Sequence, residues 1–183
     1  MPEIFRAYGF VFMFFSHEHE PIHVHVVGNG GDAKYVWDGK KGKDIFTERT
    51  MKIRRIWFED DHLYGEGDDG KTYRQSLLWY PHLREATEEE RNHYTISTIG
   101  IHWQNLNEDV SFESFSYDDA EPSAVQRFFL THKEINVAEF ARSMGMNPTL
   151  LRNYINGFKK PSKAREKQIL DHIHKLGAEM LAA

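Results

Sequence analysis

Short runs of alternating apolar and polar residues, separated by turn-forming residues, fill most of the first 115 positions. A period of two is typical of β-strands, as in "IHVHVV" at 22–27. Turns are predicted at 28–31, 38–44 and 67–70. Because no helical period separates successive early strands, the sheet is expected to be antiparallel. The predicted strands cover 8–15, 22–27, 33–37, 52–58, 62–66, 71–80, 95–103 and 109–115.

A helical period appears in two places. Thr87 and Glu90 have the spacing of a capping box, which predicts a helix at roughly 81–93. From Pro122 onward the period is helical, and the acidic, proline-containing stretch at 116–123 predicts a domain boundary. One helix after this boundary carries an apolar face of Val125, Phe128, Phe129 and His132. The last helix, from Ser162, is expected to bury Ile169, Leu170, Ile173, Leu176 and Met180.

These patterns predict an α+β protein with an antiparallel β-sheet body to about residue 116 and a helical domain from about residue 122. The 183 residues are 40% hydrophobic, which is ample for a packed core, and the absence of cysteine excludes disulfides and thiolate metal sites. No run approaches the roughly 20 apolar residues of a membrane span, and no signal peptide is evident. A cytoplasmic protein without a membrane partner or a cofactor is expected.

The segment 136–162 has the spacing of a helix-turn-helix. Asn136 is the expected cap of a first helix, with Glu139 placed for a capping box, and that helix should end at Gly145. Asn147 should cap a second helix that begins with Pro148. The inward positions of the first helix are Val137, Phe140, Ala141 and Met144, which follow the helical spacing of three, four and seven residues. Those of the second helix are Leu151 and Tyr154.

A small residue, a glycine four positions later and an aliphatic residue six positions after the glycine complete this pattern. With its Asn156-Gly157 exit, the segment resembles the DNA-binding domain of phage repressors. The same helix pair also occurs in structural bundles and in protein-interaction modules, and that alternative stays open here.

The resemblance implies that the second helix of the pair enters the major groove of double-stranded DNA. Arginine can address guanine and asparagine can address adenine, whereas lysines suit phosphates. Asn147 and the amides beside it could hold a phosphate or only cap the helix. The residues expected to bind DNA are Asn147, Thr149, Arg152, Asn153, Asn156, Lys159, Lys160 and Lys163. Since one such unit reads a half-site, a homodimer on a palindrome is expected.

Charge is distributed unevenly along the chain, whose formal net charge is −5. Residues 131–183 contain nine Lys and Arg against five Asp and Glu, a net charge of +4, and residues 1–130 carry the remaining −9. A basic end on an acidic body favours an anionic partner such as nucleic acid, although solvated lysines on a helical module would give the same count.

A dense histidine cluster, His17, His19, His23 and His25, lies within nine positions and is interleaved with Glu18 and Glu20. His23 and His25 are two apart on a predicted strand, so their side chains share a face. With His17 or His19 as a third ligand they could hold zinc. Facing a groove, they could instead act as acid and base in RNA cleavage. The remaining interpretation is a half-exposed strand whose imidazoles bond to the backbone or to the two glutamates.

Other polar features are expected to be structural. The isolated histidines His62, His82, His93 and His102 are interpreted as core or surface residues, with His102-Trp103 as a packing element. The acidic runs at 59–69 and 107–121 are expected to be solvated loops, rather than a decoy for the basic domain or a partner-binding face.

Two further motifs resemble bacterial families known only as domains of unknown function. "MPEIFRAYGFVFMFF…EHEPIHVHV" resembles DUF4160, whose hallmarks are a Met-Pro-Glu/Thr-Ile start and a histidine-rich Pro-x-His-x-His strand. Residues 1–50 match it, with Ile22 at the place of a second proline. The stretch at 77–112 resembles DUF2442 through "LLWYPHLREA" and "GIHWQNLNEDVSF". The expected segments are therefore 1–50, 51–116 and a DNA-binding domain at 122–183.

The resemblance implies a link to toxin–antitoxin modules, because genes of the two families are often neighbours and the second member is antitoxin-like. Neither family supplies an activity or a catalytic residue. The leading hypothesis is a sequence-specific, homodimeric transcriptional regulator, and not an enzyme. The alternatives are an RNase-like or metal-binding enzyme that uses the cluster at 17–25, and an interaction module that binds a partner toxin.

Overall fold

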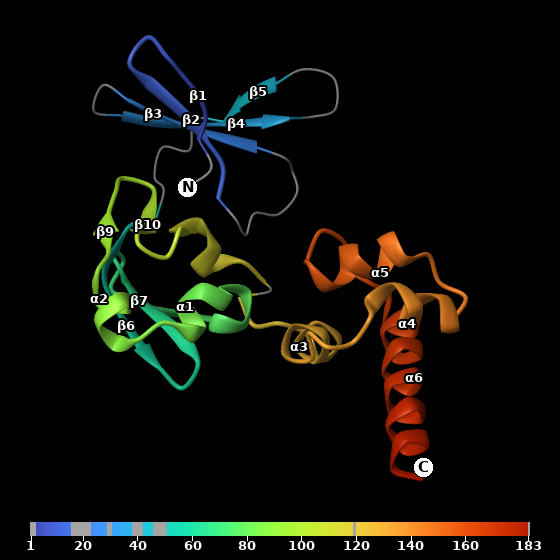
Figure 1. The fold of residues 1–183 in the computed structure, drawn as a ribbon. Coiled ribbons are helices and arrows are strands. Elements are labelled where there is room, and N and C mark those ends of the chain that lie inside the picture. Colours follow the sequence, from blue (N-terminus) through green and yellow to red (C-terminus); the bar gives the residue numbers. More distant parts are fainter. Residues whose placement is uncertain are drawn as a thin grey trace. The chain divides into compact units, whose positions relative to one another are not determined.

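The computed structural model describes residues 3–15, 23–28, 31–37, 42–45, 51–118 and 120–182. The chain divides into two compact units, Met1–Glu121 and Pro122–Ala183. Antiparallel sheets dominate the first unit, and the described part of the second is helical, so the α+β prediction is confirmed (Figure 1). No helix in the described ranges combines the length and apolarity needed to cross a membrane.

A five-stranded antiparallel meander in the order β1-β2-β3-β4-β5 forms the first sheet. The predicted strand at 8–15 was wrong at its start, because Tyr8 and Gly9 form the turn between two strands with φ of 51° and 80°. Positive φ at both central residues is what a two-residue hairpin turn of type I′ requires, and Gly9 adopts it without strain. The predicted turn at 38–44 was also too long, since a strand begins at Gly42. The strands are β1 (Glu3–Ala7), β2 (Phe10–Met13), β3 (His23–Gly28), β4 (Gly31–Trp37) and β5 (Gly42–Ile45).

Two three-stranded antiparallel sheets follow, in the orders β6-β7-β8 and β11-β10-β9. Asp60 and Asp61 form the turn between β6 and β7, again with positive φ at both residues. The predicted strand at 71–80 stops at Ser76 and continues as a short 3-10 helix, η1 (Leu77–Trp79). The strands are β6 (Ile53–Glu59), β7 (His62–Gly67), β8 (Thr72–Ser76), β9 (Thr95–Ile96), β10 (Gly100–Trp103) and β11 (Glu108–Ser111).

Three other elements predicted for this unit are interrupted or shorter in the structure. The single helix expected at 81–93 is two short ones, α1 (Pro81–Glu85) and α2 (Glu88–Asn92), although the capping box of Thr87 and Glu90 is confirmed. The strand expected at 95–103 is interrupted where the Ser97 hydroxyl accepts hydrogen bonds from the amides of Ile99 and Gly100. The strand expected at 109–115 ends at Ser111 and is followed by η2 (Glu113–Ser116).

The main core of the first unit joins the two three-stranded sheets to the short helices. Close packing on η2 leaves no room for a side chain at Gly65, where an added Cβ would lie 2.9 Å from the Phe115 ring. A smaller cluster of Met13, Phe15 and Ile99 links the five-stranded sheet to β10. The buried side chains of the main core are Ile53, Ile56, Leu63, Leu77, Tyr80, Leu83, Ile101, Trp103, Val110, Phe112 and Phe115.

Four helices form the described part of the second unit: α3 (Ala124–Thr131), α4 (Val137–Ser143), α5 (Pro148–Ile155) and α6 (Lys163–Ala182). Their shared interior contains Phe129, Phe140 and Ile169, and the Phe129 and Phe140 rings meet edge to face at 5.0 Å. The prediction for α6 was correct for Ile169 but wrong for Met180, which is 70% exposed because the helix continues beyond α3, α4 and α5.

Candidate functional site

The α4–α5 pair is fixed by backbone hydrogen bonds at the turn between the helices. The Met146 amide donates to the Ala141 carbonyl and the Gly145 amide donates to the Arg142 carbonyl, at 2.8 and 2.9 Å. This pair of hydrogen bonds is typical of a helix that ends at a residue with a left-handed backbone conformation, and Gly145 has a φ of 65°. Ala141 and Leu151 are fully buried, so the two helices pack closely. The sequence predicted both the glycine and the small residue correctly.

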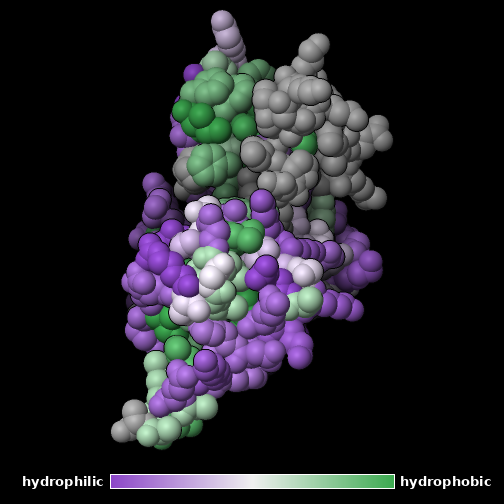
Figure 2. All heavy atoms as spheres, turned by 90° about the vertical axis from the view of Figure 1, so that its right-hand side faces the viewer, coloured by the Kyte–Doolittle hydropathy of each residue, from purple (hydrophilic) through white to green (hydrophobic). Residues whose placement is uncertain are grey.

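The predicted DNA-binding residues lie together on and after α5. Thr149, Arg152 and Asn156 are exposed, and Asn153 is half-buried. Lys159, Lys160 and Lys163 are also exposed, in the segment between α5 and the first turn of α6. The surface of the helical unit, which faces the viewer in Figure 2, is mostly hydrophilic.

Asn147 has a defined local role that the sequence anticipated. Its side-chain oxygen accepts hydrogen bonds from the amides of Thr149 and Leu150, at 2.8 and 3.4 Å, and so caps α5. The equivalent cap of α4 is Asn136, which accepts from the amides of Ala138 and Glu139. The capping box expected there is incomplete, because the Glu139 carboxylate pairs with Arg142 instead.

A second cluster lies in the first unit, where His23 and His25 meet Glu113. One ligand atom from each of the three side chains lies within 4.8 Å of the other two. The histidines share one face of β3, as predicted, and their rings are 5.0 Å apart. They are only 6% and 3% exposed, so the half-exposed strand expected from the alternation was wrong for them. His17, His19, Glu18 and Glu20 lie outside the described residues.

Glu113 was missed because the run at 107–121 was interpreted as a solvated loop. In the structure this run contains β11 and η2, and Glu108 and Asp109 are almost fully buried. The sequence also predicted a strand at 109–115, and that prediction was the available signal against a solvated loop. Lys34 on β4 forms an ion pair with Glu113 at 2.5 Å, and both side chains are less than one-fifth exposed.

A third cluster links Ser97, His102 and Asp109. His102 Nδ1 lies 2.7 Å from the Asp109 carboxylate, and His102 Nε2 lies 2.8 Å from the Ser97 hydroxyl. Burial works to raise the pKa of the Asp109 carboxyl, but hydrogen bonds to the carboxylate, with that of His102 the largest, lower it, and the net shift is downward. Because the Ser97 oxygen also accepts from two backbone amides, it closes the β9–β10 turn and is not a free nucleophile.

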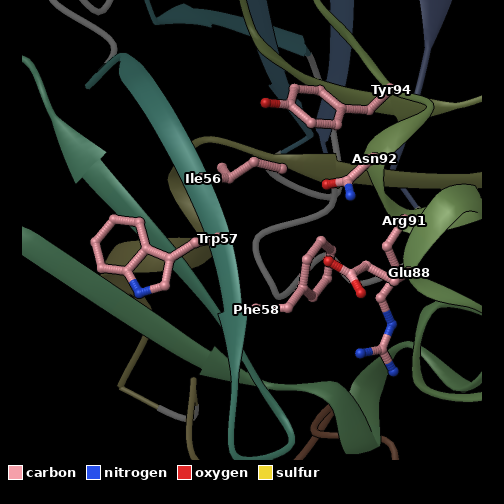
Figure 3. Close-up of a pocket in the computed structure, with 7 residues that line it drawn as sticks. All are labelled: Ile56, Trp57, Phe58, Glu88, Arg91, Asn92 and Tyr94. Carbon is pink, nitrogen blue, oxygen red and sulfur yellow. The ribbon is translucent and has the colours of Figure 1, made fainter.

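A cavity of about 420 Å³ lies between β6 and α2 (Figure 3). The Arg91 guanidinium, its cationic lining group, donates to the carbonyls of Leu83 and Arg84 and lies over the Phe58 ring at 5.2 Å. The Trp57 ring points away from the other labelled side chains. The polar groups of this cavity are therefore used within the fold or lie at its rim, and they do not converge on a ligand.

Comparison with known protein families gave two matches within the first unit. Residues 9–62 match the family model described as "Domain of unknown function (DUF4160)". Residues 53–118 match the one described as "Protein of unknown function (DUF2442)". Neither the search of curated proteins nor that of solved structures gave a match. Together the two matched ranges cover residues 9–118, and they overlap at residues 53–62.

Proposed function

We propose that the protein is a sequence-specific DNA-binding transcriptional regulator that reads DNA through α5. The observation that carries this proposal is the α4–α5 pair, with a glycine-closed turn and a capped second helix whose outer face is exposed and polar. The descriptions of the two matched families assign no activity, so the proposal rests on the helical unit.

Two short helices joined by a tight turn support a helix-turn-helix, a motif whose second helix enters the major groove. Only four residues separate Ser143 from Pro148, and the buried Ala141 permits a close crossing. Gln126 of α3 also donates to the Tyr154 carbonyl at 3.1 Å, which fixes the end of α5. A recognition helix needs this kind of rigid support, because base contacts depend on exact side-chain placement.

The outer face of α5 offers the side chains that such readout uses. Arg152 is exposed and suits the two acceptors of guanine, and Asn156 or the half-buried Asn153 suits adenine. Thr149 stands one helical turn before Arg152, near the N-terminal end that meets base edges. Lys159, Lys160 and Lys163 follow directly and supply positive charge for phosphates.

A homodimer is part of this proposal, since one unit of this kind reads only half of a palindromic site. The C-terminal half of α6 supports it: Met180 and Leu181 are 70% and 92% exposed, and Ile173 and Leu176 continue the same helix in half-buried positions. Hydrophobic side chains are visible toward the end of this helix in Figure 2. Pairing of two α6 helices would cover them.

A partner protein of toxin type is a further element of the proposal, and it follows from the resemblance of the first unit alone. Exposed apolar side chains on the five-stranded sheet and just after β2 offer contacts for such a partner, among them Ile4, Phe5, Phe14 and Tyr35. Co-purification of the product of a neighbouring gene, and its loss on substitution of Phe5 by Glu, tests this element separately.

The test of DNA reading begins with selection of bound duplexes from a random pool, followed by gel-shift titration at moderate salt. The double variant Arg152→Ala, Asn153→Ala is expected to weaken binding to the selected site about a hundredfold or more, because two base contacts are lost. Lys167→Ala removes one positive charge from an exposed position of α6 that precedes the proposed dimer contact, and it is the matched control. Retention of the selected duplex by the double variant at wild-type affinity, with an unchanged circular dichroism spectrum, would contradict the proposal.

A further inference from the structure

We infer that His23, His25 and Glu113 bind a divalent transition-metal ion, with zinc as the natural occupant. Two imidazoles and one carboxylate are a frequent donor set of zinc sites that keep one position for water. The three side chains come together with one ligand atom each within 4.8 Å of the other two. This inference is independent of DNA binding, because the residues lie in Met1–Glu121 and DNA reading is assigned to α5.

The distances between the three ligand atoms fit a zinc ion after a small side-chain movement. Donors at the corners of a zinc tetrahedron lie about 3.3 Å apart, so the widest separation here needs to shrink by at most about 1.5 Å. Rotation about the Glu113 side-chain bonds covers this range, whereas the two histidines are held by β3, which pairs with β2 and β4. The histidine pair is thus preformed, and the Glu113 carboxylate is the ligand that moves toward the ion.

Lys34 orients this carboxylate. It stands opposite His25 in the β3–β4 register and contacts one oxygen of the Glu113 carboxylate at 2.5 Å. A carboxylate has two oxygens, so the ion pair leaves one for a metal. Charged or polar groups that hold a ligating carboxylate from behind are a usual outer shell of metal sites. The Ser116 hydroxyl, which donates to the Glu113 carbonyl at 2.8 Å, fixes the turn that carries the glutamate.

The surroundings favour a metal over acid–base attack on a polymer. The Phe15 ring meets the His25 ring edge to face at 5.1 Å, and both histidines are buried. A low-polarity surrounding strengthens the attraction of a cation to a carboxylate. Such burial also keeps a large substrate such as RNA from reaching the imidazoles.

The site also joins the two matched families. His23 and His25 lie in the range of the DUF4160 match, and Glu113 lies in the range of the DUF2442 match, outside their overlap. The ligand set is therefore complete only when both domains are present, as they are in this single chain. A bound ion would fasten β3 to η2 and raise the stability of the whole first unit.

The test uses the full-length protein after removal of metal with a chelator, titrated with Zn²⁺ against a chromophoric chelator of known affinity. One tightly bound equivalent per chain is expected, with a rise in the melting temperature followed by tryptophan fluorescence. All four tryptophans lie before residue 122, so this signal reports on the first unit. Glu113→Gln should weaken zinc binding at least tenfold and abolish most of the melting shift.

Matched controls separate this site from the other histidines of the chain. Glu134→Gln and His174→Gln alter exposed residues of the second unit and should leave zinc binding unchanged. His25→Gln should also lose the tight equivalent, provided that its circular dichroism spectrum is native. Absence of a tight equivalent in the wild-type protein would overturn the inference. Wild-type zinc affinity in the folded Glu113→Gln variant would do so as well.

Discussion

Each of the two units has its own kind of stabilising interaction, short-range along the sequence in one and long-range in the other. In Pro122–Ala183, every helix whose start was predicted from a cap begins at that cap, and the caps of α4 and α5 contact amides only two and three residues away. In Met1–Glu121, the decisive contacts join distant positions, such as Lys34 with Glu113 and Gln75 with Ser114. The comparison shows that local signals define helices well and say little about where strands and polar clusters meet.

A buried polar network illustrates the long-range character of the first unit. The Gln75 side chain is fully buried, accepts from the Tyr80 hydroxyl at 2.8 Å and donates to the Ser114 hydroxyl at 3.1 Å. Ser114 in turn donates to the Ser111 carbonyl at 2.7 Å. The Gln75–Ser114 bond ties β8 to η2, and the other two bonds hold its partners in place. The loss of one partner therefore leaves another buried polar group unsatisfied.

Removal of the largest buried side chain of the first unit should produce the largest difference between the unfolding transitions of the two units. Trp103 is fully buried, and its indole donates to the Arg91 carbonyl at 2.7 Å. Trp103→Ala is expected to lower the free energy of unfolding of this unit by about 3–5 kcal/mol. The measurement is urea unfolding followed by the fluorescence of the remaining tryptophans, with circular dichroism at 222 nm for the helical unit.

The mirror variant is Leu151→Ala, at a fully buried position of the helical unit. It should move the transition seen by circular dichroism and leave the tryptophan transition in place. If either variant moves both transitions equally, the two units unfold as one and the comparison fails.

The next largest effect concerns acid stability. The pKa of Asp109 is lowered in the folded chain, so its contribution to stability is present above the unfolded pKa of about 3.9 and is lost as the pH falls through the folded value. Asp109→Asn should therefore reduce the stability of the first unit by about 1–3 kcal/mol near neutral pH. The difference from wild type should vanish well below pH 4.

This difference between Asp109→Asn and wild type should appear in the unfolding transition of the first unit, which contains Asp109. The measurement is urea unfolding of both proteins between pH 7 and pH 3 by tryptophan fluorescence. A constant gap between Asp109→Asn and wild type over this whole range would show that the carboxylate charge has no part in the His102 contact.

The sequence predicted the fold class, the helix-closing Gly145, the caps and the shared face of His23 and His25. It did not predict Glu113 as their neighbour, because the glutamate lies 88 positions after His25 and only tertiary packing brings them together. The Tyr8-Gly9 turn was missed for another reason: aromatic β-preference around it concealed a two-residue hairpin that depends on backbone conformation. Periodicity indicates which face of an element is buried, and it does not indicate which residues pack against that face.

The smallest effect compares one helix cap from each unit. Asn147→Ala removes the acceptor for two amides of α5 and should lower the stability of the helical unit by about 1 kcal/mol. Thr87→Ala removes the matching cap of α2, which has no buried residue, so local fraying uncovers less core and the tryptophan transition should move less. Thermal unfolding read by circular dichroism and by fluorescence measures both shifts.

The same Asn147 variant decides between a cap and a phosphate site. The Asn147 oxygen occupies the amides of Thr149 and Leu150, Pro148 has no amide hydrogen, and the Leu151 amide donates to the Asn147 carbonyl. The first turn of α5 therefore has no amide left over for a phosphate. DNA affinity of Asn147→Ala, measured well below its melting temperature, should equal that of wild type. A loss of tenfold or more in the folded variant would assign Asn147 itself to the DNA contact and make this turn part of the interface.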